Sequence, residues 1–133
     1  MADTVDTKVL FNGSKLYVVR LTNLSDGTGE SAVIKVDIST LTGPDRVNAP
    51  SKMKVREINY NINGFTYVRL LWDATTDDEI AHLPTGSGYI DLTGVGGSVD
   101  PKSTGATGDI LLTTGGAASG ATYDITLVLE KKQ

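Results

Sequence analysis

The chain has no cysteine, a single histidine and no long apolar run, and each absence narrows its function. Without cysteine there is no disulfide framework, thiol nucleophile, iron–sulfur cluster or Cys-based zinc site. The longest apolar runs are about four residues, far short of the ~20 that a membrane helix needs, so we expect no membrane partner. The start, Met1 to Asp6, is acidic and polar. We therefore expect no signal peptide and synthesis in the cytoplasm.

Basic residues are also few, since 12 Lys and Arg stand against 16 Asp and Glu, a formal net charge of -4. Binding to a phosphate backbone needs clustered Lys and Arg, so we expect no nucleic-acid partner. The length of 133 residues predicts one domain, 1–133, with a core that needs neither disulfides nor metal.

The chain does contain short alternating apolar runs separated by Gly, Thr, Ser and Asp. The clearest pair, 54–62 and 65–72, flanks Asn63-Gly64 and predicts a two-residue β-hairpin turn, because both residues tolerate positive φ. Asn12-Gly13-Ser14 lies between the runs 9–11 and 16–21 and predicts another hairpin.

The period of two in these runs assigns side chains to faces. In 65–72 it places Val68, Leu70 and Trp72 in the core, and Phe65, Tyr67 and Arg69 on the opposite face. In 53–62 the apolar positions change from odd to even numbers, which predicts a β-bulge near Arg56-Glu57. In 31–39 it predicts a half-buried strand with Lys35 on the solvent face.

Further strands are expected at 80–83, 89–92, 109–113 and 123–129. Residues 84–88 separate the first two of these strands, and the proline-containing segment 42–51 forms a loop. The Gly/Ser/Thr-rich segment 94–108 predicts a long surface loop, and 1–7 and 130–133 could form arms. About eight or nine short strands with frequent turns indicate an all-β fold, a single-domain β-sandwich or jelly-roll with long surface loops.

Candidate catalytic and metal-binding residues are few. His82 has no sequence neighbour to serve as an acid–base partner, and we expect a structural or exposed role. The acidic loop 73–79 holds Asp73, Asp77, Asp78 and Glu79, but it lacks the spacing of a calcium loop, and the segment 26–30 is a weaker candidate. We therefore predict no metal site, and whether 73–79 binds a cation stays open.

Two other patterns could bind ligands. Gly94 to Gly97 has no following Lys and no helix to aim its amides at a phosphate, so a flexible loop is expected and no cofactor is predicted. Aromatic residues could form a carbohydrate platform, although most are expected to fill the core. The aromatic residues considered for this platform are Tyr60, Phe65, Tyr67, Trp72 and Tyr89. No nucleophile motif is present, and we expect no enzymatic activity.

Several stretches resemble small virion proteins of tailed bacteriophages. They are Asp6 to Ser14, Val18 to Asn23, Gly64 to Asp73 and Gly108 to Thr114. The resemblance spans most of the chain and implies a capsid decoration, or cement, protein in the virion. Its implied partners are the major capsid protein and further copies of itself, with a homotrimer favoured, and it supplies no catalytic residue.

Three other functions remain as alternatives. A tail or neck component of the same kind of particle would share the resemblance and differ in copy number. A carbohydrate-binding β-sandwich module would need exposed aromatic rings, and an enzyme would need a site that the sequence does not display.

Overall fold

The computed structural model describes residues 3–13, 15–43, 46–99, 101 and 104–132, and these are almost entirely β-strand. The strands are β1 Thr4–Asn12, β2 Leu16–Asp26, β3 Val33–Val36, β4 Lys52–Trp72, β5 Asp78–Asp91, β6 Ser98–Val99, β7 Ile110–Gly115 and β8 Ser119–Lys132. Two short 3-10 helices, η1 Ile38–Thr40 and η2 Thr93–Val95, lie in the connections.

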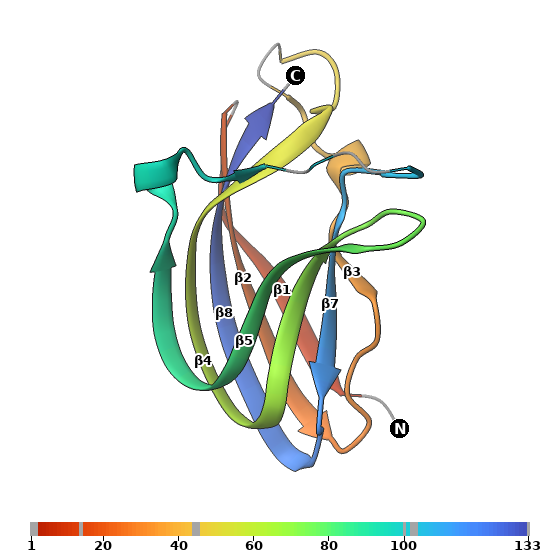
Figure 1. Cartoon of the computed structure of the whole chain (residues 1–133), viewed down its shortest axis with the longest axis vertical. Helices are drawn as coiled ribbons and strands as arrows, with labels where there is room; N and C mark the ends of the chain where they lie inside the picture. The colour runs from red at the N-terminus through yellow and green to blue at the C-terminus, as the bar shows by residue number, and fades with distance from the viewer. Residues whose placement is uncertain (1–2, 14, 44–45, 100, 102–103, 133) are drawn as a thin grey trace.

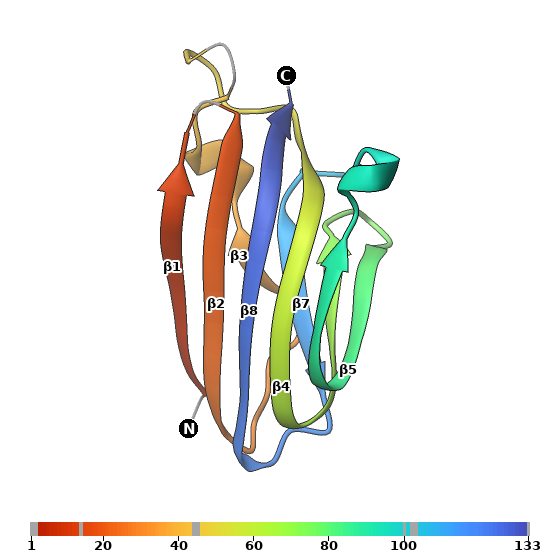
Figure 2. The same cartoon turned by 90° about the vertical axis from the view of Figure 1, so that its left-hand side faces the viewer.

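The described strands form a single antiparallel sheet that curls back over its own core (Figure 1). Its order is β1-β2-β8-β4-β7-β3, and β5 and β6 also pair with β4. Figure 2 shows β1, β2, β8, β4 and β5 running side by side. The predicted all-β class is confirmed. The narrower prediction of a sandwich or jelly-roll is not confirmed, because the two facing layers are continuous through shared strands.

The Asn63-Gly64 turn is not a β-hairpin, and this prediction was wrong. β4 is one strand that bends sharply at 63–66, and its two halves do not pair with each other. Its first half pairs with β8 and its second half with β7. Gly64 has φ +92, and a Cβ there would lie 2.8 Å from the Cα of Ala121. Glycine is therefore required by backbone conformation and by close approach.

On both sides of β4 the pairing changes at the position of its bend. On one side the pairing with β5 passes from Ile62–Gly86 to Tyr67–Pro84, so the predicted strands 80–83 and 89–92 are parts of one bent strand. On the other side the pairing passes from Asn63–Thr122 in β8 to Tyr67–Gly115 in β7. Three adjacent stretches of chain therefore bend together and fold one layer over the other.

The core fills the space between the layers. Val68, Leu70 and Trp72 are buried as predicted, and Tyr67 and Arg69 are half-buried on the opposite face. Phe65 is also buried, which contradicts the prediction, because the bend restarts the alternation of faces. The largest fully buried side chains include Trp72, Tyr123, Phe65, Leu21, Met53, Ile58, Ile62, Leu70 and Leu83.

Register shifts in β4 and β3 set which of their residues face the core. The predicted bulge near Arg56-Glu57 is confirmed, since the register of β4 against β8 shifts between Val55 and Glu57. A second register shift lies between Ile34 and Val36 in β3. It turns Lys35 into the interior, where the sequence had placed it on the solvent face.

The predicted loop 42–51 precedes β4, and the segment 94–108 holds only η2 and β6 among its described residues. Most described residues of the expected arms lie in strands: 4–7 belong to β1 and 130–132 to β8. Lys131 is buried and its Nζ donates to Asn12 Oδ1, Gly13 O and Thr42 O at 2.6, 2.7 and 2.8 Å. These bonds tie the end of β8 to the predicted and confirmed β1–β2 turn.

No helix in the described ranges combines the length and hydrophobicity that a membrane span requires.

Candidate functional site

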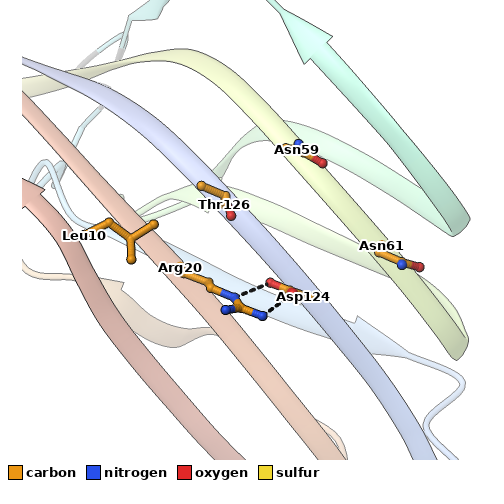
Figure 3. Close-up of a pocket in the computed structure, with 6 residues that line it drawn as sticks. All are labelled: Leu10, Arg20, Asn59, Asn61, Asp124 and Thr126. Atoms are coloured by element: carbon orange, nitrogen blue, oxygen red, sulfur yellow. Dashed lines mark hydrogen bonds and ion pairs between the residues drawn. The ribbon is translucent and has the colours of Figure 1, made fainter.

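A shallow hollow of about 460 Å³ lies on the outer face of the sheet (Figure 3). Four adjacent strands supply its lining, β1, β2, β8 and β4. The lining residues are Leu10, Arg20, Asn59, Asn61, Asp124 and Thr126.

Sheet register brings these distant residues together. Arg20 lies opposite Thr126, and Thr126 lies opposite Asn59, so the three form one row across β2, β8 and β4. Asp124 and Asn61 are opposite each other in the next row. Because successive side chains in a strand alternate, the intervening residues Ile125 and Leu127 point into the core and fix the orientation of the row.

One ion pair organises the centre of the hollow. Arg20 Nε donates to Asp124 Oδ1 at 2.9 Å and Arg20 Nη2 donates to Oδ2 at 2.6 Å. The hydrogen bonds and charge of Asp124 raise the pKa of Arg20 above its ordinary value. Both side chains stay about half exposed, so the pair is fixed in orientation yet reachable from solvent.

The remaining polar groups of the hollow are not used inside the molecule. The amides of Asn59 and Asn61 and the hydroxyl of Thr126 form no side-chain hydrogen bond within the part of the chain that the structure describes. Each amide offers two donors and one acceptor oxygen. This part of the outer face can therefore hydrogen-bond an external partner without breaking an internal contact.

An exposed aromatic ring extends the same face. Tyr89 of β5 lies opposite Asn59, with 57% of its surface exposed. Its hydroxyl donates to Glu57 Oε1, and this hydrogen bond raises the pKa of Tyr89 to about 12. Tyr89 therefore stays neutral, and its exposed side chain lies beside Asn59.

The edge strand β1 is a second exposed surface. All nine of its residues are exposed, and among the described strands it pairs only with β2. Its large apolar residues Val5, Val9, Leu10 and Phe11 are 46%, 47%, 49% and 55% exposed. A strand edge of this kind carries main-chain groups that can pair with another strand.

The structure gives His82 partners that sequence reasoning missed. His82 is exposed on β5 and its ring stacks on Tyr67, with ring centroids 4.9 Å apart. Its Nδ1 lies 3.8 Å from Glu79 Oε1, which also accepts from Arg69 Nε at 2.8 Å. Residues three apart in a regular strand point to opposite faces, so the spacing alone could not have signalled this contact. The register shift between Glu79 and Ala81 against β4 places Glu79 on the same face as His82.

Three of the four acidic residues of 73–79 are used separately, while Asp78 Oδ2 is buried without a hydrogen-bond partner among the described residues. Asp73 accepts from Thr107 Oγ1 and Asp77 from the backbone of Ala74, while Glu79 pairs with Arg69. Among the described residues no three His, Cys, Asp or Glu side chains gather as metal ligands. The loop at Gly94 to Gly97 is mostly exposed, with Gly96 and Gly97 at φ +82 and +89. Of the other candidate aromatics, Tyr60 and Tyr67 are half-buried.

Segment 26–30, considered for cation binding, contributes instead to a buried network. Glu30 Oε2 lies 2.5 Å from Lys35 Nζ, with both side chains almost fully buried. Glu30 Oε1 accepts from Tyr123 Oη at 2.6 Å and from Asn23 Nδ2 at 2.7 Å. Burial and the hydrogen bond to Glu30 raise the pKa of Tyr123. Asp3 joins the network by accepting from Asn23 at 3.0 Å.

No protein-family model and no curated protein matches the chain. Among solved structures, it is similar to FeII HppE in complex with substrate, with a TM-score of 0.39, 15% identity, and coverage of 92% of this chain and 53% of that one. It is also similar to hydroxypropylphosphonic acid epoxidase from S. wedmorenis, with a TM-score of 0.36, 14% identity, and coverage of 92% and 49%. The chain spans about half the length of these proteins. Similarity this low does not establish a shared fold, and we transfer nothing from them.

Proposed function

We propose that the chain is a non-enzymatic virion structural protein, a capsid decoration or cement protein that binds the outer face of a phage shell. The observation that carries this proposal is the outer face of the sheet, where Asn59, Asn61 and Thr126 offer hydrogen bonds that the molecule does not use. The resemblance of the sequence to small virion proteins supplies the kind of partner, the major capsid protein.

Binding of this kind requires no covalent step. The hollow is backed by the buried residues of β2, β8 and β4, so the backbone that carries its polar groups is fixed before contact. Preorganised groups lose little conformational freedom on binding. The net charge of -4 helps to keep the free protein soluble before assembly.

Particles that lack the protein provide the test. Adding back the wild-type protein is expected to raise the temperature at which the particle releases its DNA, with hundreds of copies bound per virion. Asn61→Lys removes the Asn61 amide and places a longer side chain in the hollow, so it is expected to weaken particle binding at least about tenfold, a change of ~1.4 kcal/mol. Thr76→Lys, with the same charge change in the exposed loop 73–77, is the control and should bind as wild type.

Equal release temperatures with and without the protein would contradict the cement role. A handful of copies per particle would instead favour a tail or neck component.

A carbohydrate-binding function is the second candidate, and a specific observation favours it. Tyr89 presents an exposed ring beside Asn59, and aromatic rings with neighbouring amides suit a neutral sugar. Binding of a neutral oligosaccharide that is lost in Tyr89→Ala, with particle binding unchanged in that variant, would favour this candidate over the cement role.

A further inference from the structure

The edge strand β1 carries a pattern that the shell-binding surface does not explain. An exposed strand edge with apolar side chains promotes pairing with another chain and is normally blunted by charges, proline or a bulge. β1 has one register shift against β2, between Val9 and Phe11, and residues 4–9 before it are regularly paired. The only charged residues in β1 are Asp6 and Lys8, close to its centre. Neither forms an ion pair within the described part of the chain.

We propose that β1 pairs antiparallel with β1 of a second copy, about a two-fold axis at Thr7. This register places Asp6 of each copy opposite Lys8 of the other, and Val5 opposite Val9. Cross-strand pairs of opposite charge and of β-branched residues both stabilise a sheet. Each favourable pair occurs twice, because a two-fold interface is self-complementary.

Other registers are less favourable for identifiable reasons. Partners in a sheet must point to the same face, so a shift by one residue is excluded. The nearest allowed registers are centred on Asp6 or on Lys8, and each sets two like charges directly opposite one another. Within the central part of β1, the register at Thr7 alone pairs both charges with opposite charges.

The pairing has a consequence for the outer face. Val5, Thr7 and Val9 lie opposite Asn23, Leu21 and Val19 of β2, on the inner side of the sheet. A two-fold axis through Thr7 places the inner faces of the two sheets on the same side. The sheet therefore continues from one copy into the next. The hollows of both copies then face the same way, and a flat target can be bound by both at once.

This inference differs from the trimer that the sequence resemblance implies, because a two-fold interface closes at two copies. It concerns the purified protein alone. Its failure would leave shell binding through the hollow untouched, and failure of shell binding would leave the pairing untouched.

The lack of cysteine makes a cross-linking test specific. Thr7 residues of the two copies would have Cα atoms about 4.5–5.5 Å apart, within the range that a disulfide spans. Thr7→Cys is therefore expected to form a reducible covalent dimer under mild oxidation. Thr4→Cys, also exposed in β1, is the control: its copies would lie about 20 Å apart, and it should stay uncross-linked. Equal cross-linking of both variants, or of neither, would overturn the proposal.

Charge exchange gives an independent test by sedimentation equilibrium. Asp6→Lys and Lys8→Asp each create two like-charge pairs and are expected to weaken self-association at least about tenfold, as a change of ~1.4 kcal/mol does. The double exchange should restore it, and an equimolar mixture of the two single variants should form a mixed dimer. Lys15→Asp, an exposed site outside β1, should associate as wild type. A wild-type mass of one or three copies, or a double exchange no better than the single ones, would refute the two-fold pairing.

Discussion

Lys35 and Glu30 form an ion pair whose side chains are only 3% and 5% exposed. Removing one partner of such a pair leaves a buried charge uncompensated. We expect Lys35→Met to lower the free energy of unfolding by about 3–5 kcal/mol, measured by denaturant titration at pH 7. Adding Glu30→Gln removes the second charge and should recover much of the loss. Lys15→Met, at an exposed lysine, is the control, and a double variant no more stable than the single one would contradict this account.

The surroundings of Asp109 predict that its contribution to stability falls as pH rises, which is opposite to the behaviour of most carboxylates. Burial raises its pKa, as do the charges of Asp37 and Asp73, although Ile38 N donates to its Oδ1 at 3.0 Å. Between the unfolded value of 3.8 and the raised folded value, the native state holds more protons than the unfolded state, so this group lowers stability as pH rises through that window.

The variant Asp109→Asn keeps an acceptor for Ile38 N and removes the charge. It should therefore raise the melting temperature at pH 7, and the gain should shrink below pH 3.8, where wild-type Asp109 is protonated in both states. A gain that is unchanged at low pH would show that the charge of Asp109 is not its cause.

Lys35 also shows what sequence patterns miss at this scale. Its position in an alternating run assigned it to solvent, and only the register shift after Ile34 turns it inward. The shift in β4 was predictable because its apolar residues change from odd to even positions. β3 is four residues long, too short for a second set of apolar positions to reveal the change.

At the level of elements, the bend of β4 predicts a graded response to alanine. Gly64→Ala should cost about 1–3 kcal/mol for positive φ and more for the contact with Ala121. Gly86 has φ +121 and open space around it, so Gly86→Ala should lower the free energy of unfolding less than Gly64→Ala does. Gly94→Ala, with neither constraint, is the control and should leave the melting temperature unchanged. Equal losses at Gly64 and Gly86 would rule out a role for the contact with Ala121.

The strands themselves were largely predictable, and their pairing was not. Alternation located β8 and β2, because each lies in one layer and keeps one period of burial. β4 and β5 cross between layers, and an Asn-Gly pair supports a hairpin and a bend equally well by its local backbone preference. The difference lies in the partners, β8 and β7, whose paired residues are between 38 and 80 positions away in the chain.

The candidate site was out of reach of the sequence for the same reason. Arg20, Asn59 and Thr126 meet only through the register of β2, β8 and β4. Nothing in their local surroundings distinguishes them from other exposed polar residues in strands.

For the whole molecule, the shared strands predict one cooperative unfolding transition. β4 contributes to both layers, and the core between them is continuous. Trp72 reports on the layer with β7, while far-UV circular dichroism reports on the whole sheet. The two signals should give the same midpoint in denaturant, as two-state unfolding requires. Separate midpoints would show that the layers unfold independently.

The matched bends also limit where the chain can change length. An insertion or deletion within β4 would move Gly64 away from Ala121 and shift one side of the bend against Gly86 and 116–121. A change of length in β4 alone would break the pairing at the bend, because the segments paired on both sides of it would need the same insertion or deletion. Tolerated insertions should therefore concentrate in the connections 42–51, 73–77 and 93–108, and lineages of this protein should differ in length there while the strands keep theirs.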